Sequence, residues 1–153
     1  MEPVLHIALM NPEIGPNAGN IGRLCLGIGA RLHLVHPLGF DTNDKAVRRA
    51  GLDYWKHVDV VEHDDAGAFW RWTEGRRVHL LSTKATRSYA QPEWQSGDVL
   101  VFGPESRGLD EALFDEFPVF QIPMTGPIRS LNLSNAVAVV AYAALQRITP
   151  DLF

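Results

Sequence analysis

The sequence "VLHIALMNPEIGPNAGNIGRLCLGI", Val4 to Ile28, passes from an apolar run through a loop rich in glycine and proline into a second apolar pattern. The first part, Val4–Met10, is short and almost wholly apolar, which is typical of a buried β-strand. From Asn17 to Ile28 the apolar residues recur at helical spacing, so we expect a helix there. A strand followed at once by a helix begins a βα unit and predicts an α/β fold.

The same alternation continues along the chain. We expect further strands at Leu32–His36, Val58–Glu62, Val78–Ser82, Val99–Gly103 and Val119–Ile122. We expect further helices at Lys45–Ala50, Asp65–Thr73, Leu109–Glu116 and Leu133–Ile148. Apolar strands that alternate with helices predict a mainly parallel sheet with helices on both faces.

The length of 153 residues, without an internal linker, predicts a single domain over residues 1–153. The net charge of -4 gives no general attraction to nucleic acid, so a nucleic-acid site would have to be a local basic patch. We expect a cytoplasmic protein outside the membrane, because no secretion signal is apparent and the longest apolar run, Ala136–Leu145, is too short to span a bilayer. The single cysteine, Cys25, stands at an apolar helical position and is expected to be buried.

The glycines of the opening loop, Gly15, Gly19 and Gly22, follow a strand and precede a helix, as in nucleotide-binding loops. Their spacing differs from that of the dinucleotide and P-loop motifs and therefore favours neither site. Arg23 stands about one turn into the expected helix, where its guanidinium and exposed backbone amides together would hold an anion such as phosphate. An ordinary arginine on the helix surface is the alternative interpretation.

Three loops follow expected strand ends and contain proline or glycine, namely Thr83–Gly97, Val101–Asp110 and Pro123–Leu131. Ligands of open α/β sheets bind beyond the carboxyl ends of the strands. The strand ends near Leu81, Gly103 and Ile122 therefore form the candidate binding site. A purely structural role for these loops is the alternative.

The expected last helix, Leu133–Ile148, is apolar almost all round for several turns. A helix that lies on a sheet in a small domain keeps a polar outer face unless another surface covers it. A homodimer interface explains this pattern, since two-fold dimers are the commonest oligomers. A central core helix in a monomer is the alternative.

Other catalytic classes have no support in the sequence. No G-x-S-x-G nucleophile motif is present. The histidines have no paired helical spacing and accompany only one cysteine, so we expect no metal site and interpret them as scaffold or surface residues. They are His6, His33, His36, His57, His63 and His79.

Three segments, taken in order, resemble the motifs of the SPOUT superfamily of S-adenosylmethionine-dependent RNA methyltransferases. They are "NPEIGPNAGNIGR" (Asn11–Arg23), "LVFGPESRGL" (Leu100–Leu109) and "IPMTGPIRSLNLSNAVAVVAY" (Ile122–Tyr142). A fourth segment, "DKAVRRAGLDYW" (Asp44–Trp55), resembles the single-domain branch that methylates the ribose 2'-hydroxyl of the tRNA wobble nucleotide, cytidine or uridine 34. The resemblance covers nearly the whole chain.

The resemblance implies a deep trefoil knot in the C-terminal part of the α/β domain, which general topology rules would not predict. It also implies a homodimer that buries the last helix. The cofactor implied is S-adenosylmethionine, which leaves as S-adenosylhomocysteine. The cofactor positions that match are Leu81, Gly103, Ile122, Ser130 and Leu131.

The resemblance further implies that Arg23 and Ser134 are catalytic. A guanidinium is a poor proton acceptor because its pKa lies above about 12, so we expect Arg23 to anchor a phosphate and to stabilise developing alkoxide charge. The implied substrate-binding residues are Asn17, Arg129, Asn135 and Tyr142. For Asn17, Ser134 and Asn135, helix capping is the alternative role. Glu105 matches an acidic position of the second motif, whose role the sequence does not separate from loop structure.

The partner implied by the resemblance is the anticodon stem-loop of tRNA. Basic side chains that a dimer would double occur in three sets: Lys45, Arg48 and Arg49; Arg71, Arg76 and Arg77; and Lys84 with Arg87. Each set is also consistent with an ordinary solvated face. Two alternatives remain: methylation at another tRNA or ribosomal RNA position, and a non-catalytic RNA-binding module on the same scaffold.

Overall fold

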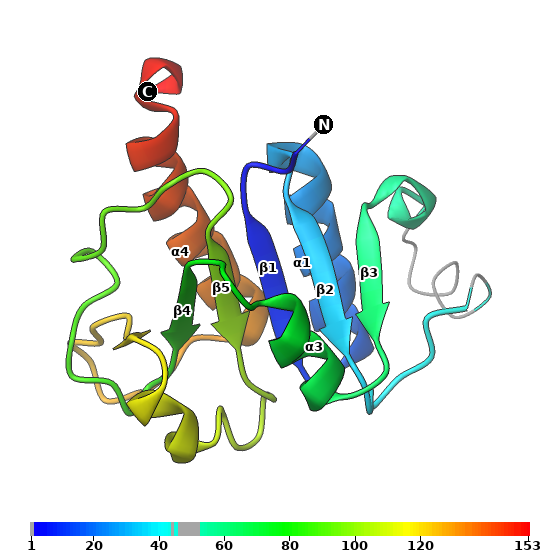
Figure 1. Cartoon of the computed structure of the whole chain (residues 1–153), viewed down its shortest axis with the longest axis horizontal. Helices are drawn as coiled ribbons and strands as arrows, with labels where there is room; N and C mark the ends of the chain where they lie inside the picture. The colour runs from blue at the N-terminus through cyan, green and yellow to red at the C-terminus, as the bar shows by residue number, and fades with distance from the viewer. Residues whose placement is uncertain (1, 44, 46–52) are drawn as a thin grey trace.

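The computed structural model describes residues 2–43, 45 and 53–153 (Figure 1). Its centre is a six-stranded sheet in the order β3-β2-β1-β5-β4-β6, and every neighbouring pair is parallel. The strands are β1 (His6–Met10), β2 (Arg31–Val35), β3 (Val60–His63), β4 (Val78–Leu81), β5 (Val99–Phe102) and β6 (Val119–Phe120). All the expected strands are confirmed, with ends that differ by one or two residues.

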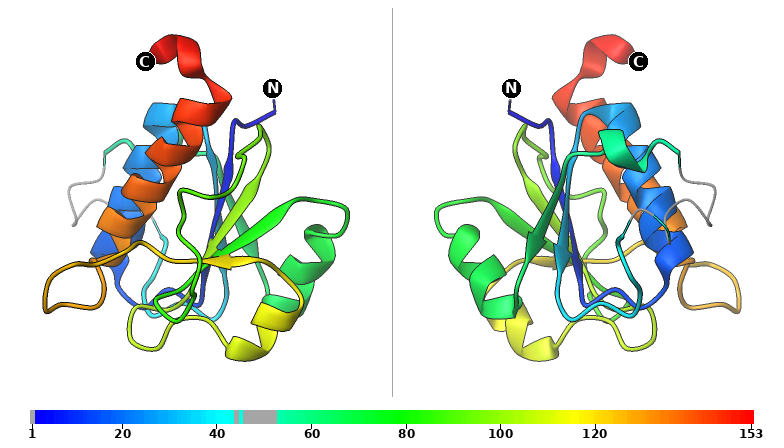
Figure 2. Two further views of the ribbon diagram at one scale, coloured as in Figure 1. Left: turned by 90° about the vertical axis from the view of Figure 1, so that its left-hand side faces the viewer. Right: turned by 90° about the vertical axis from the view of Figure 1, so that its right-hand side faces the viewer.

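The helices cover both faces of the sheet, as the sequence predicts. On one face lie α1 (Gly15–Ile28) and α4 (Leu133–Ile148), side by side, and on the other lies α3 (Ala66–Trp72) (Figure 2). Short 3-10 turns occupy η1 (Trp55–His57), η2 (Glu111–Asp115) and η3 (Pro150–Leu152). Within the described residues, no helix has both the length and the apolar character needed to cross a membrane.

One expected helix is replaced by a 3-10 turn, and another lies almost wholly outside the described residues. The expected helix Leu109–Glu116 is wrong in type, because the chain forms only the five-residue 3-10 turn η2 between its caps Asp110 and Glu116. A run this short suits the tighter 3-10 geometry. The expected helix Lys45–Ala50 lies outside the described residues apart from Lys45.

The side chains of β1 alternate between two cores. Ile7 and Leu9 pack with α1 and α4, whereas Ala8 and Met10 pack with α3 on the opposite face. Cys25 is fully buried in the first of these cores, as expected, and burial raises the pKa of its thiol to about 12. The Cys25 side chain is therefore a small apolar packing group, unreactive at neutral pH.

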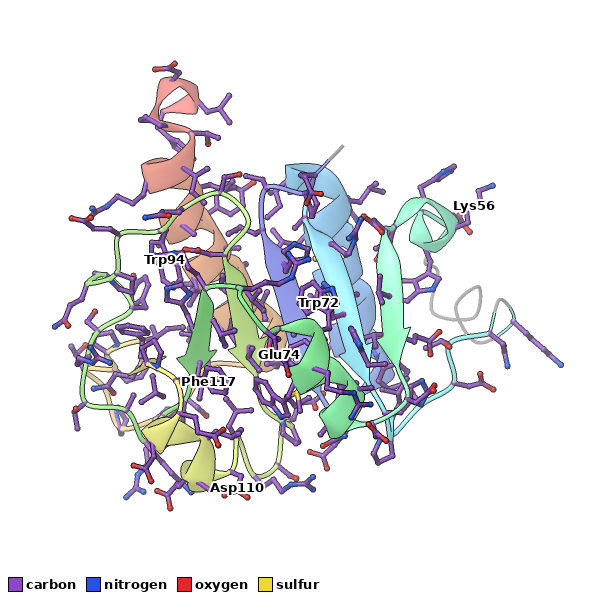
Figure 3. All side chains as sticks on the ribbon, viewed as in Figure 1. Lys56, Trp72, Glu74, Trp94, Asp110 and Phe117 are labelled. Carbon is purple, nitrogen blue, oxygen red and sulfur yellow. The ribbon has the colours of Figure 1, made fainter. Side chains whose placement is uncertain are left out.

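A buried chain of three histidines runs across β1, β2 and β3 beneath α3. Nδ1 of His6 lies 2.9 Å from Nε2 of His33, and Nδ1 of His33 lies 2.8 Å from Nε2 of His63. Trp72 projects from α3 onto this chain and makes ring contacts with all three imidazoles (Figure 3). These histidines are scaffold residues, as expected. In the described part of the chain, no group of three or more His, Cys, Asp or Glu side chains is arranged to hold a metal ion.

Burial makes the protonated form of these imidazoles unfavourable. It lowers the pKa of His6 to about 4, with a smaller contribution from the positive charge of Arg76. It lowers the pKa of His33 to about 2, and the neighbouring His6 and His63 add to the shift. The pKa of His63 is lowered for the same reason of burial. The folded state therefore holds a neutral histidine chain.

We predict that the protein loses stability in mild acid. The unfolded chain protonates these histidines near pH 6.5 and the folded chain does not, so stability is full above pH 6.5 and falls as the pH drops towards 4. Each such histidine contributes a slope of about 1.4 kcal/mol per pH unit. Urea unfolding at pH 7.5, 6.0 and 5.0 measures this slope. Equal unfolding free energies from pH 7.5 to 5.0 would contradict the prediction.

Candidate functional site

A pocket of about 420 Å³ opens beyond the carboxyl ends of β4, β5 and β6. Its apolar walls include Phe102 and Phe120, which end their strands. The loops that follow these strands supply the rest of the lining. All the expected cofactor residues line it, namely Leu81, Gly103, Ile122, Ser130 and Leu131. The pocket therefore lies where ligand sites of open α/β sheets are found, and its lining suits a flat, largely apolar ligand.

The pocket loop after β5 folds back tightly on its own strand end at Gly103. A Cβ atom on Gly103 would lie 2.4 Å from the backbone carbon of Gly108 and from the nitrogen of Leu109. Gly108 adopts φ +70°, a left-handed conformation that favours glycine. The close approach at Gly103 is therefore that of the chain's own backbone.

Glu105, in this same loop, caps the beginning of α1. Its carboxylate accepts hydrogen bonds from the backbone N–H of Glu13 at 2.8 Å and of Ile14 at 2.9 Å. It also accepts one from Nδ2 of Asn17 at 3.2 Å. Ile14 is the N-cap residue and has no side-chain acceptor of its own, so an acid from a distant loop satisfies the helix start. A negative charge here is also favourable to the helix dipole.

Glu13, in turn, binds the loop that carries Glu105. Its carboxylate accepts the backbone N–H of Ser106 at 2.8 Å and the Ser106 hydroxyl at 3.0 Å. These two bonds lower the pKa of the Glu13 carboxyl, the backbone bond contributing more than the hydroxyl. Glu13, Glu105 and Ser106 thus form a reciprocal set of hydrogen bonds, called here the Glu13–Glu105 clamp, that joins the first and second motifs.

The start of α4 is joined to the same clamp through two asparagines. Nδ2 of Asn132 donates to Oδ1 of Asn17 at 3.1 Å. The other side of the Asn132 amide caps α4, because its Oδ1 accepts from the backbone N–H of Ser134 at 2.9 Å and from the Ser134 hydroxyl at 2.6 Å. The capping alternatives for Asn17, Ser134 and Asn135 are therefore wrong, since Ile14 and Asn132 are the N-cap residues. An asparagine directly before a helix is a recognisable capping signal, and the sequence analysis missed it at Asn132.

Arg23 lies on the exposed side of α1, away from the pocket lining of its own chain. The expectation that it combines with free amides of the first turn is wrong. The helix begins at Gly15, which places Arg23 about 12 Å further along the axis, and Glu105 already occupies the amides of Glu13 and Ile14. The guanidinium instead lies over the ring of Tyr54, 5.7 Å from its centroid.

The structure divides the remaining site residues into two groups. Asn17 and Arg129 line the pocket together with the expected cofactor residues. Ser134 and Asn135 stand at the beginning of α4 outside the pocket lining, and Tyr142 is 48% exposed on the outer side of the same helix. Arg23 and Tyr142 therefore both lie outside the pocket of their own chain.

Comparisons with known proteins agree over nearly the whole chain. A family profile described as "SpoU rRNA Methylase family" matches residues 4–142. The tRNA (cytidine(34)-2'-O)-methyltransferase of Escherichia coli (strain K12) is 47% identical over 148 residues, which cover 95% of this chain and 94% of that protein. A solved structure described as "Structural insights into the 2-OH methylation of C/U34 on tRNA" superposes with a TM-score of 0.91 at 46% identity, covering 97% of this chain and 98% of that one. The AdoMet complex of the SpoU methyltransferase AviRb from Streptomyces viridochromogenes shares the fold, with a TM-score of 0.81 at 22% identity over 96% of this chain and 61% of that one.

We predict that Glu105→Ala destabilises the fold by about 1 to 3 kcal/mol, because it leaves the amides at the start of α1 without their acceptor. Ser106→Ala is the matched control. It removes only the hydroxyl bond to Glu13, keeps the backbone bond, and should cost about 0.5 kcal/mol. Urea denaturation at pH 7.5 measures both. Equal losses for the two variants would show that Glu105 does not cap α1.

Proposed function

The chain belongs to the SpoU rRNA Methylase family, and we propose that it is an enzyme that methylates the ribose 2'-hydroxyl of nucleotide 34, a cytidine or uridine, in tRNA. The observation that carries this proposal is the 47% identity, over 95% of the chain, to a tRNA (cytidine(34)-2'-O)-methyltransferase. The pocket and the clamp described above provide the scaffold on which the reaction would take place.

We infer that the pocket binds S-adenosylmethionine. Its volume of about 420 Å³ falls in the range of small-molecule sites. Leu81, Ile122 and Leu131 provide apolar walls, and Ser130 provides a hydroxyl. When bound, this cofactor supplies a methyl group on a sulfonium sulfur and is left as S-adenosylhomocysteine.

The protein's contribution to the transfer is to align the groups and to stabilise charge. The lining residues would hold the cofactor, which would supply its methyl group to the ribose 2'-oxygen, and the hydroxyl proton would pass to water. Arg23 would donate hydrogen bonds to the adjacent phosphate and stabilise the developing alkoxide, since a guanidinium is a poor base. Ser134 is the second proposed catalytic residue. It stands at the start of α4, where its hydroxyl donates a hydrogen bond to Oδ1 of Asn132. Asn17, Arg129, Asn135 and Tyr142 would bind the substrate.

We propose that the enzyme acts as a homodimer. Val139 and Tyr142 on α4 are 37% and 48% exposed, and Leu26 on the adjacent α1 is 42% exposed. A second copy on this face would cover apolar surface and would bring the exposed Arg23 and Tyr142 towards a pocket. By resemblance to the superfamily, we also propose that the C-terminal part forms a deep trefoil knot and that the enzyme works in the cytoplasm.

The basic sets differ in how free they are to contact the anticodon stem-loop. Arg77 is paired with Asp98 at 2.7 Å, and Lys84 lies 3.9 Å from Glu111. Arg76 lies 4.2 Å from the centroid of the Trp72 ring. Arg71 and Arg87 are exposed, and the Arg87 guanidinium lies 4.8 Å from the centroid of the Phe120 ring. Arg48 and Arg49 lie outside the described residues. We infer that tRNA binding uses exposed members of these sets and weakens steeply as the salt concentration rises.

The proposed reaction is tested by incubating the protein with labelled S-adenosylmethionine and total tRNA. The digested tRNA is then mapped by mass spectrometry. We expect label on the 2'-oxygen of cytidine or uridine 34. Label at another tRNA position, or on ribosomal RNA offered in parallel, would favour the first alternative. Binding of RNA with no transfer at all would favour the non-catalytic module.

We predict that Arg23→Lys lowers the rate of methyl transfer at least about 100-fold, because lysine cannot reproduce the forked hydrogen bonds of a guanidinium. Binding of S-adenosylmethionine, measured by calorimetry, should stay within about twofold because Arg23 does not line the pocket. Arg147→Lys, at an exposed position in the last turn of α4, is the control and should leave the rate within about twofold. Unchanged transfer by Arg23→Lys would remove Arg23 from the mechanism.

A further inference from the structure

Tyr54 lies directly before η1 and contacts α1 at two points. Its hydroxyl donates a hydrogen bond to the carbonyl oxygen of Gly19 at 3.0 Å. The face of its ring lies beneath the Arg23 guanidinium, 5.7 Å from ring centroid to Cζ. Both contacts fall on the same turn of the helix. No other residue in the described part of the chain makes a cation–π contact with Arg23.

The two contact points are related through the helix backbone. In an α-helix the carbonyl of residue i accepts the N–H of residue i+4, so the Gly19 carbonyl is the acceptor for the backbone N–H of Arg23. The Tyr54 hydroxyl binds this same carbonyl. The phenol is thereby fixed to the turn that begins at Gly19 and ends at Arg23, with its ring along the path of the arginine side chain.

Trp55, the residue after Tyr54, packs the beginning of η1 against α1. A Cβ atom on Gly22 would lie 2.6 Å from the ring of Trp55, so the indole fits against α1 only because position 22 is glycine. Trp55 is partly buried and packs against the first core. Tyr54 therefore reaches Arg23 from a segment that is anchored independently of the arginine.

We propose that Tyr54 is a positioning residue that directs the Arg23 guanidinium for the methyl-transfer reaction. This inference rests on the proposed function. A long arginine side chain on a helix surface samples many rotamers, and stacking on a fixed aromatic face reduces their number. A cation–π contact uses the charge of the guanidinium and none of its hydrogen-bond donors, so the N–H groups of Arg23 can still bind phosphate.

Tyr54 itself does not take the proton from the ribose. Burial raises the pKa of its phenol above the usual value, and the positive charge of Arg23 opposes this shift only in part. The phenol is therefore neutral at physiological pH, and its proton is engaged with the Gly19 carbonyl. Its role is to hold Arg23, and the effect of removing it should disappear when Arg23 is absent.

The test is a double-mutant cycle in which kcat, KM for tRNA and the affinity for S-adenosylmethionine are measured. Tyr54→Leu should lower kcat about tenfold, with cofactor affinity within about twofold. Tyr54→Phe keeps the ring and should lower kcat about threefold. In an Arg23→Lys background, Tyr54→Leu should change kcat less than twofold. Trp70→Leu on α3 is the control, because it removes aromatic packing on the opposite face of the sheet from Arg23. It should lower the melting temperature and leave kcat within about twofold.

Two results would overturn the inference: a kcat of Tyr54→Leu equal to that of the wild type, or the same loss in the wild-type and Arg23→Lys backgrounds. If Tyr54→Leu does not fold, Tyr54→Phe decides through the same cycle, and full activity of that variant would count against the role of the hydroxyl. Absence of methyl transfer by the wild-type protein would be a failure of the proposed function, and the inference would fall with it. If the wild-type protein is active and the Tyr54 substitutions leave kcat unchanged, only this inference is overturned and the proposed function stands.

Discussion

The carboxylate of Glu105 lies at the point where the first and second motifs meet, and it accepts the backbone N–H groups of Glu13 and Ile14. The start of a helix needs acceptors for its free amides, and Ile14 cannot supply one. Glu105 reaches this position only because the loop after β5 turns back at Gly103, where any larger residue would collide with Gly108 and Leu109. The placement of α1 and the shape of the pocket loop therefore depend on the same contacts.

Asn17 bonds both to Glu105 and to Asn132, the residue that caps α4. The beginning of α1, the pocket loop and the beginning of α4 thus form one connected polar unit beside the pocket. Further along α1, Arg23 rests on Tyr54. A ligand that orders the pocket loop would therefore steady the helix that carries the proposed catalytic arginine.

The sequence predicted those features that depend on local pattern. Strands such as β5 are wholly buried and read as continuous apolar runs, and α4 has the bounds expected from its periodicity. The rule that ligands bind at strand ends indicated Leu81, Gly103 and Ile122, whereas Ser130 and Leu131 came from the family resemblance. The role of Glu105 could not be predicted in this way, because its partner Ile14 lies 91 positions away. The histidine chain joins residues 27 and 30 positions apart, and only the parallel pairing of β1, β2 and β3 brings them together. The trefoil knot stays a prediction from resemblance.

The central claim is that the Glu13–Glu105 clamp couples the pocket to α1. The most direct test is backbone hydrogen exchange, measured by NMR with and without S-adenosylhomocysteine. The amides of Glu13, Ile14 and Ser106 are donors in the clamp, so they should exchange slowly in the free protein and more slowly still when the ligand is bound. Added protection confined to the pocket residues 81–84 and 120–131, with no change at Glu13 and Ile14, would contradict the coupling.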